Sequence, residues 1–387
     1  MLPCQKPLFS LPDDEHYLNC AYMSPISKRV EAAGVQGLAR KRVPSRLSPP
    51  DFFTETDRAR ELFARLVNVS DPRRIAVIPA ASYGLAVAAR NLPLSTGQNV
   101  VIAHEQFPAN VYPWRKQCAA TGAELRVVRP PEAVERRGRL FNERLLEAID
   151  ARTAMVALGH VHWTDGTRFD LEAIGARARE VGAALIVDAT QSVGAMPFDV
   201  ERLQPDALIC AAYKWLMGPY SIGFAYYGPR FDTGDPLEET WIGRLGSENF
   251  KELVSYQDEY QPGALRYDVG ERSNFVLMPM AIAGLEQVLE WTPEGIQAYC
   301  AALTGDLVDQ VRALGFAVEG LDGRGAHLFG LRTPPGVDLQ ALASTLAARR
   351  VLVSLRGSAV RVAPHVYNDA RDIEALHDAL VEAVRSR

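Results

Sequence analysis

The sequence contains no long apolar segment and no block of like charge. No stretch of its 387 residues is apolar for eighteen positions, and no apolar segment follows a basic start at the N-terminus. We therefore expect neither a membrane span nor a secretory signal. The 42 basic and 47 acidic side chains are mixed along the chain and leave a net charge of -5. This balance argues against nucleic acid or an anionic membrane as the main partner and favours a small molecule.

Cysteine is also scarce. The chain has five cysteines, an odd number, and they are widely spaced without a C-x-x-C pair. This pattern indicates neither a disulfide framework nor a thiolate metal site, and it fits a protein of the reducing cytoplasm. A G-x-G-x-x-G motif is missing after the first predicted strand, which argues against a nucleotide-dependent oxidoreductase.

Apolar residues are plentiful, at 48% of the chain, so a large core is expected. Residues 75–228 alternate short apolar runs with amphipathic helical segments, the pattern of βαβ units in a mainly parallel sheet. The pattern predicts seven strands, at residues 74–80, 99–105, 123–129, 153–161, 183–190, 206–212 and 221–228. Predicted helices lie between them at residues 85–92, 109–122, 142–150 and 170–182. The connection before the last strand is too short for a parallel crossover, so we expect that strand to be antiparallel.

The remaining sequence suggests a second, smaller unit. Residues 231–272 have weak periodicity, which predicts irregular structure around a site or an interface, and a helix is expected at 276–291. A C-terminal α/β unit would follow, with strands at 315–320 and 350–355 and a helix at 369–386. We expect an N-terminal segment (1–20) packed with this small domain, a large domain (21–275), and a linking helix with the small domain (276–387).

Three polar residues occupy informative positions, because ligands of open α/β sheets bind beyond the carboxyl ends of strands. Ser82 stands between the first strand and a helix, which is typical of an anion cradle, although serine is also a common N-cap. Asp188 ends an apolar strand and needs a cationic partner, unless it is an ordinary turn aspartate. Lys214 interrupts the apolar run 206–219 and is either functional or a surface lysine.

Taken together, these residues suggest a cofactor. A phosphate cradle, a carboxylate beside a ring nitrogen and a lysine in an apolar pocket are the groups that pyridoxal phosphate requires. Lys214 would form an imine with the aldehyde, and Asp188 would keep the pyridine nitrogen protonated. The aromatic side chain of Phe107 or Trp163 would cover one face of the ring.

The chain also resembles a known family. Its matching segments are residues 104–114, 160–174, 185–227, 269–274 and 360–369. They resemble the class V aminotransferase family of fold-type I pyridoxal phosphate enzymes, which includes cysteine desulfurases, kynureninases and isopenicillin N epimerase-like proteins. The resemblance implies a three-layer large domain with a mostly parallel seven-stranded sheet, a smaller C-terminal α/β domain, and a homodimer with its sites near the interface.

By this resemblance, several residues acquire roles toward the cofactor. Lys214 carries the imine, Asp188 pairs with the pyridine nitrogen, and Gln191 bonds the phenolic oxygen. Ser82 and the amide of Ala81 hold the phosphate.

The resemblance assigns four further residues. Tyr213 replaces a common histidine, and its hydroxyl would reach the phosphate. Ser273 and Asn274 fall where a partner subunit usually reaches the phosphate. Arg361 would grip the α-carboxylate of an amino-acid substrate, although its alternation with valines alone favours the exposed face of a strand.

Departures from the family pattern narrow the function. Desulfurases have a cysteine just before this arginine, but residues 355–361 contain none, so persulfide-forming desulfuration is not expected. Phe107 replaces a stacking histidine and cannot transfer protons, and Trp163 replaces a small polar residue. We expect an aminotransferase or a C–S or C–C lyase; the alternatives are an amino-acid epimerase or a non-catalytic member. His160 and His162 have no third ligand nearby, so no metal is expected.

Overall fold

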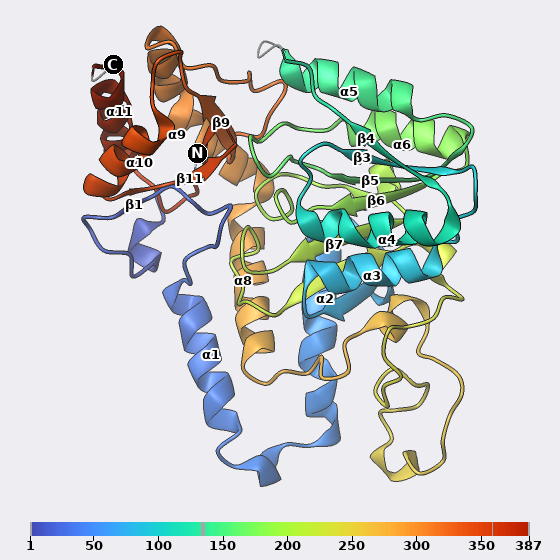
Figure 1. Cartoon of the computed structure of the whole chain (residues 1–387). Helices are drawn as coiled ribbons and strands as arrows, with labels where there is room; N and C mark the ends of the chain where they lie inside the picture. Colours follow the sequence, from blue (N-terminus) through green and yellow to red (C-terminus); the bar gives the residue numbers. More distant parts are fainter. Residues whose placement is uncertain (1, 133–135, 358, 386–387) are drawn as a thin grey trace.

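The computed structural model describes residues 2–132, 136–357 and 359–385, and its centre is a seven-stranded sheet (Figure 1). All seven predicted strands are present: β2 (Ile75–Ile78), β3 (Asn99–Ala103), β4 (Glu124–Val128), β5 (Thr153–Gly159), β6 (Ala184–Asp188), β7 (Ala207–Ala211) and β8 (Gly223–Tyr227). They lie in the order β2-β8-β7-β6-β5-β3-β4. The neighbours from β7 to β4 are parallel, whereas β8 is antiparallel to both β7 and β2. The predicted antiparallel last strand is confirmed.

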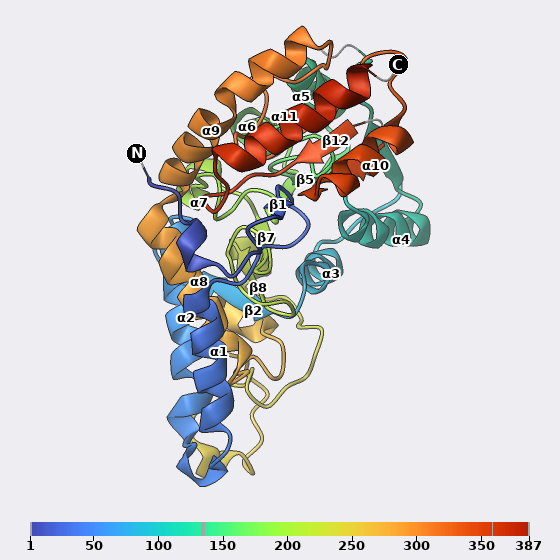
Figure 2. The same ribbon diagram turned by 90° about the vertical axis from the view of Figure 1, so that its left-hand side faces the viewer.

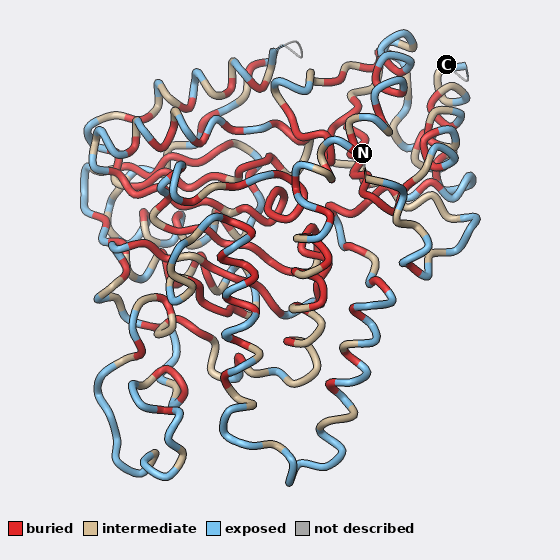
Figure 3. Tube along the Cα trace, turned by 180° about the vertical axis from the view of Figure 1, so that it is seen from behind, coloured by how far each residue is buried: buried red, intermediate tan, exposed pale blue. Residues whose placement is uncertain are grey.

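Helices cover both faces of this sheet. One face packs against α3 (Ala81–Asn91) and α4 (Tyr112–Thr121), and the other against α2 (Thr54–Leu66), α5 (Arg137–Ala148), α6 (Leu171–Glu180) and α8 (Leu277–Trp291). Successive strand residues supply the two cores in turn, as a period of two requires: Val156 and Val187 enter one core, Ala157 and Ile186 the other. The inner strands are therefore buried (Figure 3). This is the expected three-layer α/β arrangement.

The C-terminal part forms a smaller unit above this sheet (Figure 2). Its three-stranded antiparallel sheet has the order β11 (Ser354–Arg356), β12 (Ala359–Val362), β9 (Phe329–Arg332). The helices α9 (Pro293–Ala313), α10 (Leu339–Ala348) and α11 (Ala370–Arg385) contribute to the same core.

Two strand predictions in this unit need correction. Residues 315–320 do not form a strand, because the chain turns toward α5, where the Glu319 carboxylate accepts a hydrogen bond from Gly138 N at 2.8 Å. The strand predicted at 350–355 is split into β10 (Val351–Leu352) and β11. The two pieces have different partners: β10 pairs with β1 (His16–Tyr17), whereas β11 pairs with β12.

The N-terminal segment connects the two sheets. After β1, Leu18 packs into the small core, and Ser24 N donates to the carbonyl of Tyr213, beside Lys214, at 3.0 Å. The helix α1 (Lys28–Arg40) then packs along α8 (Figure 1). N-terminal residues thus lie beside the carboxyl end of β7.

The stretch 231–272 is irregular, as expected. Its described regular elements are short 3-10 helices: the end of η6 (Pro229–Phe231), η7 (Phe250–Glu252) and η8 (Gly263–Tyr267). The other 3-10 helices of the described chain are η1 (Lys6–Leu8), η2 (Pro44–Arg46), η3 (Pro49–Phe52), η4 (Pro72–Arg74) and η5 (Pro108–Asn110). One further short helix is α7 (Val200–Leu203). Asp268 joins the end of this stretch to the sheet, because its buried carboxylate accepts hydrogen bonds from Arg60, Arg272 and Val77 N. In the described part of the chain, no helix is long and apolar enough to span a membrane.

Candidate active site

A cavity of about 310 Å³ lies beyond the carboxyl ends of β5, β6 and β7. Eight predicted site residues line it: Ala81, Ser82, Phe107, Trp163, Asp188, Gln191, Tyr213 and Lys214. These residues follow five different strands, so the fold gathers side chains that are far apart in sequence. The other three predicted residues, Ser273, Asn274 and Arg361, do not line the cavity.

Lys214 is buried in the short connection between β7 and β8, with only 6% of its surface exposed. Its Nζ lies 5.5 Å from the centre of the Phe107 ring and 5.4 Å from that of Tyr213. Burial lowers the pKa of Lys214 to about 8, because the ammonium loses hydration, while the Asp188 carboxylate opposes this shift. The alternative of a surface lysine is therefore wrong, and the amine loses its proton near pH 8, at a lower pH than an exposed lysine.

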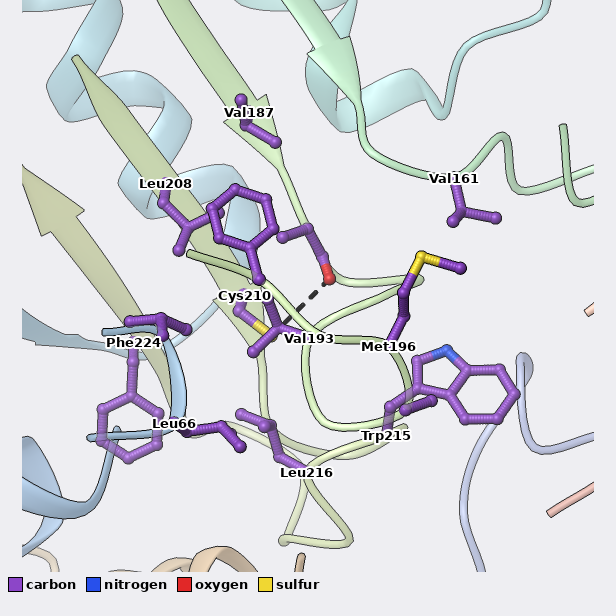
Figure 4. Packing of buried hydrophobic residues seen from close by; sticks show 14 of the residues in the cluster. Leu66, Val161, Val187, Val193, Met196, Leu208, Cys210, Trp215, Leu216 and Phe224 are labelled. Carbon is purple, nitrogen blue, oxygen red and sulfur yellow. Dashed lines mark hydrogen bonds between the residues drawn. The ribbon is translucent and has the colours of Figure 1, made fainter. Parts of the chain in front are cut away.

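The connection that carries Lys214 is packed tightly against the core. Trp215 and Leu216 enter the core directly after it, beside Cys210 of β7 (Figure 4). Gly194, with a φ of 100°, approaches so closely that a Cβ there would lie 2.3 Å from the Trp215 carbonyl oxygen. The backbone that follows the lysine is thus fixed by contacts with the core.

Asp188 is the last residue of β6, and its surroundings give its ionised carboxylate little stabilisation. Burial raises the pKa of its carboxyl group, whereas hydrogen bonds from Thr190 and the positive charge of Lys214 lower it. Thr190 N donates to Asp188 Oδ1 at 3.1 Å, as in an ordinary turn. Because the net shift is upward, a cation bound in the cavity would stabilise the ionised carboxylate further.

The N-terminus of α3 also faces the cavity. Its N-cap is Ala80, which has no polar side chain to accept the first amide hydrogens. Ser82 is therefore not the N-cap, and Ser82 and the first helical residue, Ala81, line the cavity instead. Free amide groups and the positive end of the helix dipole favour an anion at this point.

Gln191 has partners at both ends of its amide. Its Nε2 donates to the Ala21 carbonyl at 3.1 Å, and its Oε1 accepts from Trp215 Nε1 at 3.0 Å. This arrangement fixes which end of the amide is the donor. Since an amide nitrogen carries two hydrogens, Gln191 retains one N–H for a ligand.

Aromatic rings form one wall of the cavity. The Phe107 and Trp163 rings meet edge to face, with their centres 5.4 Å apart. Trp163 is held by a hydrogen bond of 2.6 Å from Nε1 to the Glu105 carbonyl. At the rim, the Tyr213 ring lies 4.7 Å from the exposed ring of Tyr220.

Arg361 lies just behind this wall. It is buried on β12, so the expectation of an exposed strand face, which its alternation with valines favoured, is wrong. Its Nη1 donates to the Trp163 carbonyl at 2.9 Å, and its Nη2 lies 3.3 Å from Ser354 Oγ and 3.4 Å from Asn19 Oδ1. Its charge also lowers the pKa of Lys214. Arg361 is thus near the cavity but separated from it by Trp163.

Ser273 and Asn274 lie outside the cavity of the single chain. Ser273 Oγ donates to the Phe52 carbonyl. Asn274 Oδ1 accepts from the backbone N–H groups of Val276 and Leu277 at 3.1 and 2.9 Å, at the start of α8. Both side chains thus have structural partners, and their predicted contact with a phosphate in a second subunit stays a prediction.

The two histidines of the H-x-H sequence have separate surroundings. His162 lines the cavity, with Nε2 3.0 Å from the His104 carbonyl and Nδ1 2.7 Å from Thr164 Oγ1. His160 packs against the Phe198 ring at 5.3 Å, and burial lowers its pKa to about 3. Each histidine thus has a structural explanation of its own.

Sequence reasoning missed several polar residues. Gln106 and Asn110 line the cavity, and one amide atom of each is buried without a hydrogen-bond partner in the described structure. Gln106 stands just after the end of a predicted strand, and this position marks it as a possible site residue although no role was assigned to it; Asn110 lies farther on, in η5, and has no such signal. Asn19 and Ser354, which contact Arg361, gave no such signal, because they come from segments more than 300 residues apart.

The sequence model of the family described as Aminotransferase class-V matches residues 50–376. The chain belongs to the class V aminotransferase family. An uncharacterized aminotransferase of Bacillus subtilis is 26% identical to it, covering 85% of this chain and 84% of the relative. A probable cysteine desulfurase of Methanothermobacter thermautotrophicus is 25% identical, covering 84% and 82%. The predicted family is confirmed, and this class V aminotransferase family member is a pyridoxal phosphate-dependent enzyme whose reaction the family does not specify.

Solved structures confirm the fold of the family member. A cysteine desulfurase from Thermococcus onnurineus matches with a TM-score of 0.85 and 19% identity over 100% of both chains. The cystine C-S lyase C-DES, in complex with its product cysteine persulfide, matches with a TM-score of 0.84 and 17% identity, over 96% of this chain and 98% of the lyase. The expected fold-type I architecture is therefore confirmed.

The cysteines of this family member lie away from the cavity wall. Among the described residues, none of those that line the cavity is a cysteine. Cys20 is fully buried near Lys214, and burial raises the pKa of its thiol to about 12. Cys300 is buried in α9, and burial raises its pKa too. Neither thiol is poised to act as a thiolate.

Proposed function

We propose that this enzyme binds pyridoxal phosphate through Lys214 and converts an amino acid by transamination or by C–S or C–C cleavage. The observation that carries the proposal is a buried lysine, with a pKa lowered to about 8, in one cavity with Asp188 and the N-terminus of α3. When bound, the cofactor supplies an aldehyde carbon and a ring that withdraws electrons from the α-carbon of the substrate.

The groups around the cavity fit this cofactor. The uncapped N-terminus of α3, with Ala81 and Ser82, suits a phosphate group. The carboxyl group of Asp188, whose pKa burial raises, suits a protonated ring nitrogen. Gln191 has one N–H left for the phenolic oxygen, because its other amide contacts are made within the chain. The hydroxyl of Tyr213 is a further candidate for the phosphate.

The remaining residues would act on the ring and the substrate. The aromatic wall of Phe107 and Trp163 would cover the ring and exclude water. Lys214, with its lowered pKa, would accept the proton from the substrate's α-carbon and return it at that atom or beyond. Arg361 would bind the α-carboxylate, since a planar guanidinium matches a carboxylate in two places. This role requires a small movement of the Trp163 carbonyl, which Arg361 now contacts.

We propose that the reaction is not a persulfide-forming desulfuration. That reaction needs a thiolate within reach of the substrate's sulfur. The described lining residues offer none, and the thiol of Cys20 has a pKa raised to about 12. The relatives include a probable cysteine desulfurase as well as an uncharacterized aminotransferase. The absence of a suitable cysteine in the described cavity wall favours the latter.

We further propose a homodimer in which Ser273 and Asn274 approach the phosphate of the other subunit. Both residues lie at the start of α8, outside their own cavity. The cytoplasm remains the proposed compartment on the basis of the five unpaired cysteines.

The cofactor proposal is tested by absorbance and labelling. Purified protein, after addition of pyridoxal phosphate, should absorb visible light, and borohydride should remove this band and leave a label on Lys214. Lys214→Ala should lose the label and turnover, whereas Lys251→Ala, at an exposed position, should keep both. Protein that stays colourless, or a Lys214→Ala variant with full activity, would refute the proposal.

The reaction is tested separately with a panel of amino acids. Each is incubated with and without a keto-acid acceptor, and keto acid, ammonia, sulfide and inverted amino acid are assayed. Keto acid formed only with an acceptor identifies transamination, and keto acid with ammonia identifies a lyase. Sulfide with alanine would show a desulfurase and contradict the proposal, and inverted amino acid would show an epimerase.

A further inference from the structure

A second cavity of about 310 Å³ adjoins the first behind Trp163. We call it the annex. Four arginines line it, Arg129, Arg137, Arg332 and Arg356, against the acidic residues Glu105, Glu132 and Asp165. The annex also includes Thr164, the residue after Trp163, so the same short segment borders both cavities.

The charged side chains that line the annex differ in whether they form ion pairs. The Asp165 carboxylate lies 3.0 Å from Arg332 Nη2 and 3.5 Å from Arg137 Nε. Arg356, by contrast, forms no ion pair with any described residue. Its Nη1 donates to the neighbouring Leu355 carbonyl at 2.8 Å, and its buried Nε has no hydrogen-bond partner in the described structure. Burying part of a guanidinium without a counter-charge is unfavourable, unless a bound anion supplies that counter-charge.

Arg356 and Arg361 lie on the same face of the small sheet. Ser354 is directly opposite Arg361 in the register of β11 and β12, and Arg356 is two residues beyond Ser354 on the same strand. Side chains two residues apart share one face of a strand, as do directly opposed cross-strand pairs. The other face, with Val360 and Val362, packs into the small core.

Trp163 lies between these two arginines. Its carbonyl oxygen accepts from Arg361 Nη1 at 2.9 Å, and its ring centre is 5.3 Å from the Arg356 guanidinium carbon. Since Trp163 lines the cofactor cavity, two guanidinium groups stand behind one wall of that cavity. Only Arg361 has a role in the proposed reaction.

We infer that Arg356 recognises a second anionic group of the substrate, which is therefore an amino acid with a distal carboxylate or a similar oxyanion. This inference rests on the proposed function, in which Arg361 takes the α-carboxylate. The guanidinium of Arg356 supplies the fork that such a group requires, and its buried Nε has no hydrogen-bond partner within the described chain. The Trp163 ring keeps the fork oriented by a cation–π contact.

The inference is tested on protein loaded with pyridoxal phosphate, using dicarboxylates that cannot react. Malonate, succinate, glutarate and adipate are titrated by calorimetry, each beside the monocarboxylate of the same length. One length should bind at least about 10-fold more tightly than its monocarboxylate, because one charge-assisted contact contributes roughly 10- to 100-fold in affinity. Equal binding of dicarboxylates and monocarboxylates at every length would overturn the inference, whatever the variants do.

Two variants locate the effect. Arg356→Gln should remove the dicarboxylate preference and leave monocarboxylate affinity within about threefold. Arg129→Gln, in the same annex but exposed and hydrogen-bonded to His104 at 2.8 Å, should keep the preference. If Arg356→Gln does not fold, Arg356→Lys, which keeps the charge but loses the fork, should weaken the preference. Equal loss of both ligand classes in the Arg356 variants would show that the residue only supports Trp163, and would refute the inference.

Kinetics and labelling complete the test. The wild-type enzyme should prefer glutamate over glutamine, or aspartate over asparagine, in KM, and Arg356→Gln should abolish this difference. Borohydride labelling of Lys214 on the same samples reports on the proposed function alone. Labelling without a dicarboxylate preference would refute only the substrate inference, whereas an Arg356-dependent preference without labelling would refute only the cofactor proposal.

Discussion

Replacing Gly194 by alanine tests whether the packing beneath Lys214 positions the amine. Gly194 has a φ of 100°, a conformation that costs an alanine roughly 1–3 kcal/mol. The new methyl group would also lie 2.3 Å from the Trp215 carbonyl oxygen and 2.6 Å from its carbon. Because both contacts are with backbone, the peptide between Trp215 and Leu216, one residue beyond Lys214, or the Gly194 backbone must move, and such overpacking costs about a further 1–3 kcal/mol.

Gly182→Ala is the matched control. Gly182 has a φ of 77°, and no atom outside its chain neighbours lies within 4 Å of an added Cβ. This variant therefore has the conformational strain without the collision, and should lose only about 1–2 kcal/mol of unfolding free energy. Gly194→Ala should lose about 1–3 kcal/mol more than this control.

Urea denaturation of the two variants gives the difference in unfolding free energy. Borohydride labelling of Lys214 gives the functional consequence. We expect Gly194→Ala to label more slowly than Gly182→Ala, because only the former displaces the backbone next to the lysine. Equal stability loss in the two variants, or normal labelling of a destabilised Gly194→Ala, would refute the argument that this contact positions the amine.

Three further predictions concern Trp215, Lys214 and Asp268. Trp215→Phe removes the donor to Gln191 Oε1, so the amide is no longer oriented, and the visible absorption of the cofactor-loaded protein should shift; an unchanged spectrum would contradict this. Because burial lowers the pKa of Lys214 to about 8, the neutral amine becomes more abundant as pH rises, and the rate of pyridoxal phosphate capture should rise with a midpoint near pH 8; a midpoint near 10 would indicate an exposed lysine. Asp268→Asn removes the buried carboxylate that pairs with Arg60 and Arg272 and leaves Arg60 only Asp57, 3.5 Å from its Nε; urea denaturation should show a loss of about 3–5 kcal/mol, whereas a loss below about 1 kcal/mol would refute this.

The large sheet could be predicted because its signal is local. Each inner strand is a short apolar run bounded by polar residues, and both of its faces are buried by helices. The antiparallel direction of β8 could be predicted because the connection between β7 and β8 is too short for a parallel crossover. By contrast, residues 315–320 have the composition of a strand but turn toward α5, where Glu319 binds Gly138 N. No local pattern could reveal that partner, which is 181 residues away in sequence.

The residues of the candidate site also differ in whether a local sequence pattern reveals them. Ser82, Asp188 and Lys214 could be found because each lies at the end of a strand or in the short segment after it, and parallel strands end at one edge of the sheet. The burial of Arg361 could not be found, since alternation with valines looks the same whether water or another segment covers the polar face. Here Asn19, from the N-terminal segment, covers that face together with Trp163.

The positions of the charges suggest how one site could bind two kinds of anion, the phosphate of the cofactor and the carboxylates of the substrate, each at a separate place. The N-terminus of α3 belongs to the large unit and offers backbone N–H groups, which suit the compact dianion of a phosphate. Arg361 and Arg356 belong to the small sheet and offer planar forks, which suit carboxylates. In the proposed roles, the geometry of each anion directs the cofactor phosphate to α3 and the substrate carboxylates to the small sheet, whereas a net positive charge alone would attract both alike.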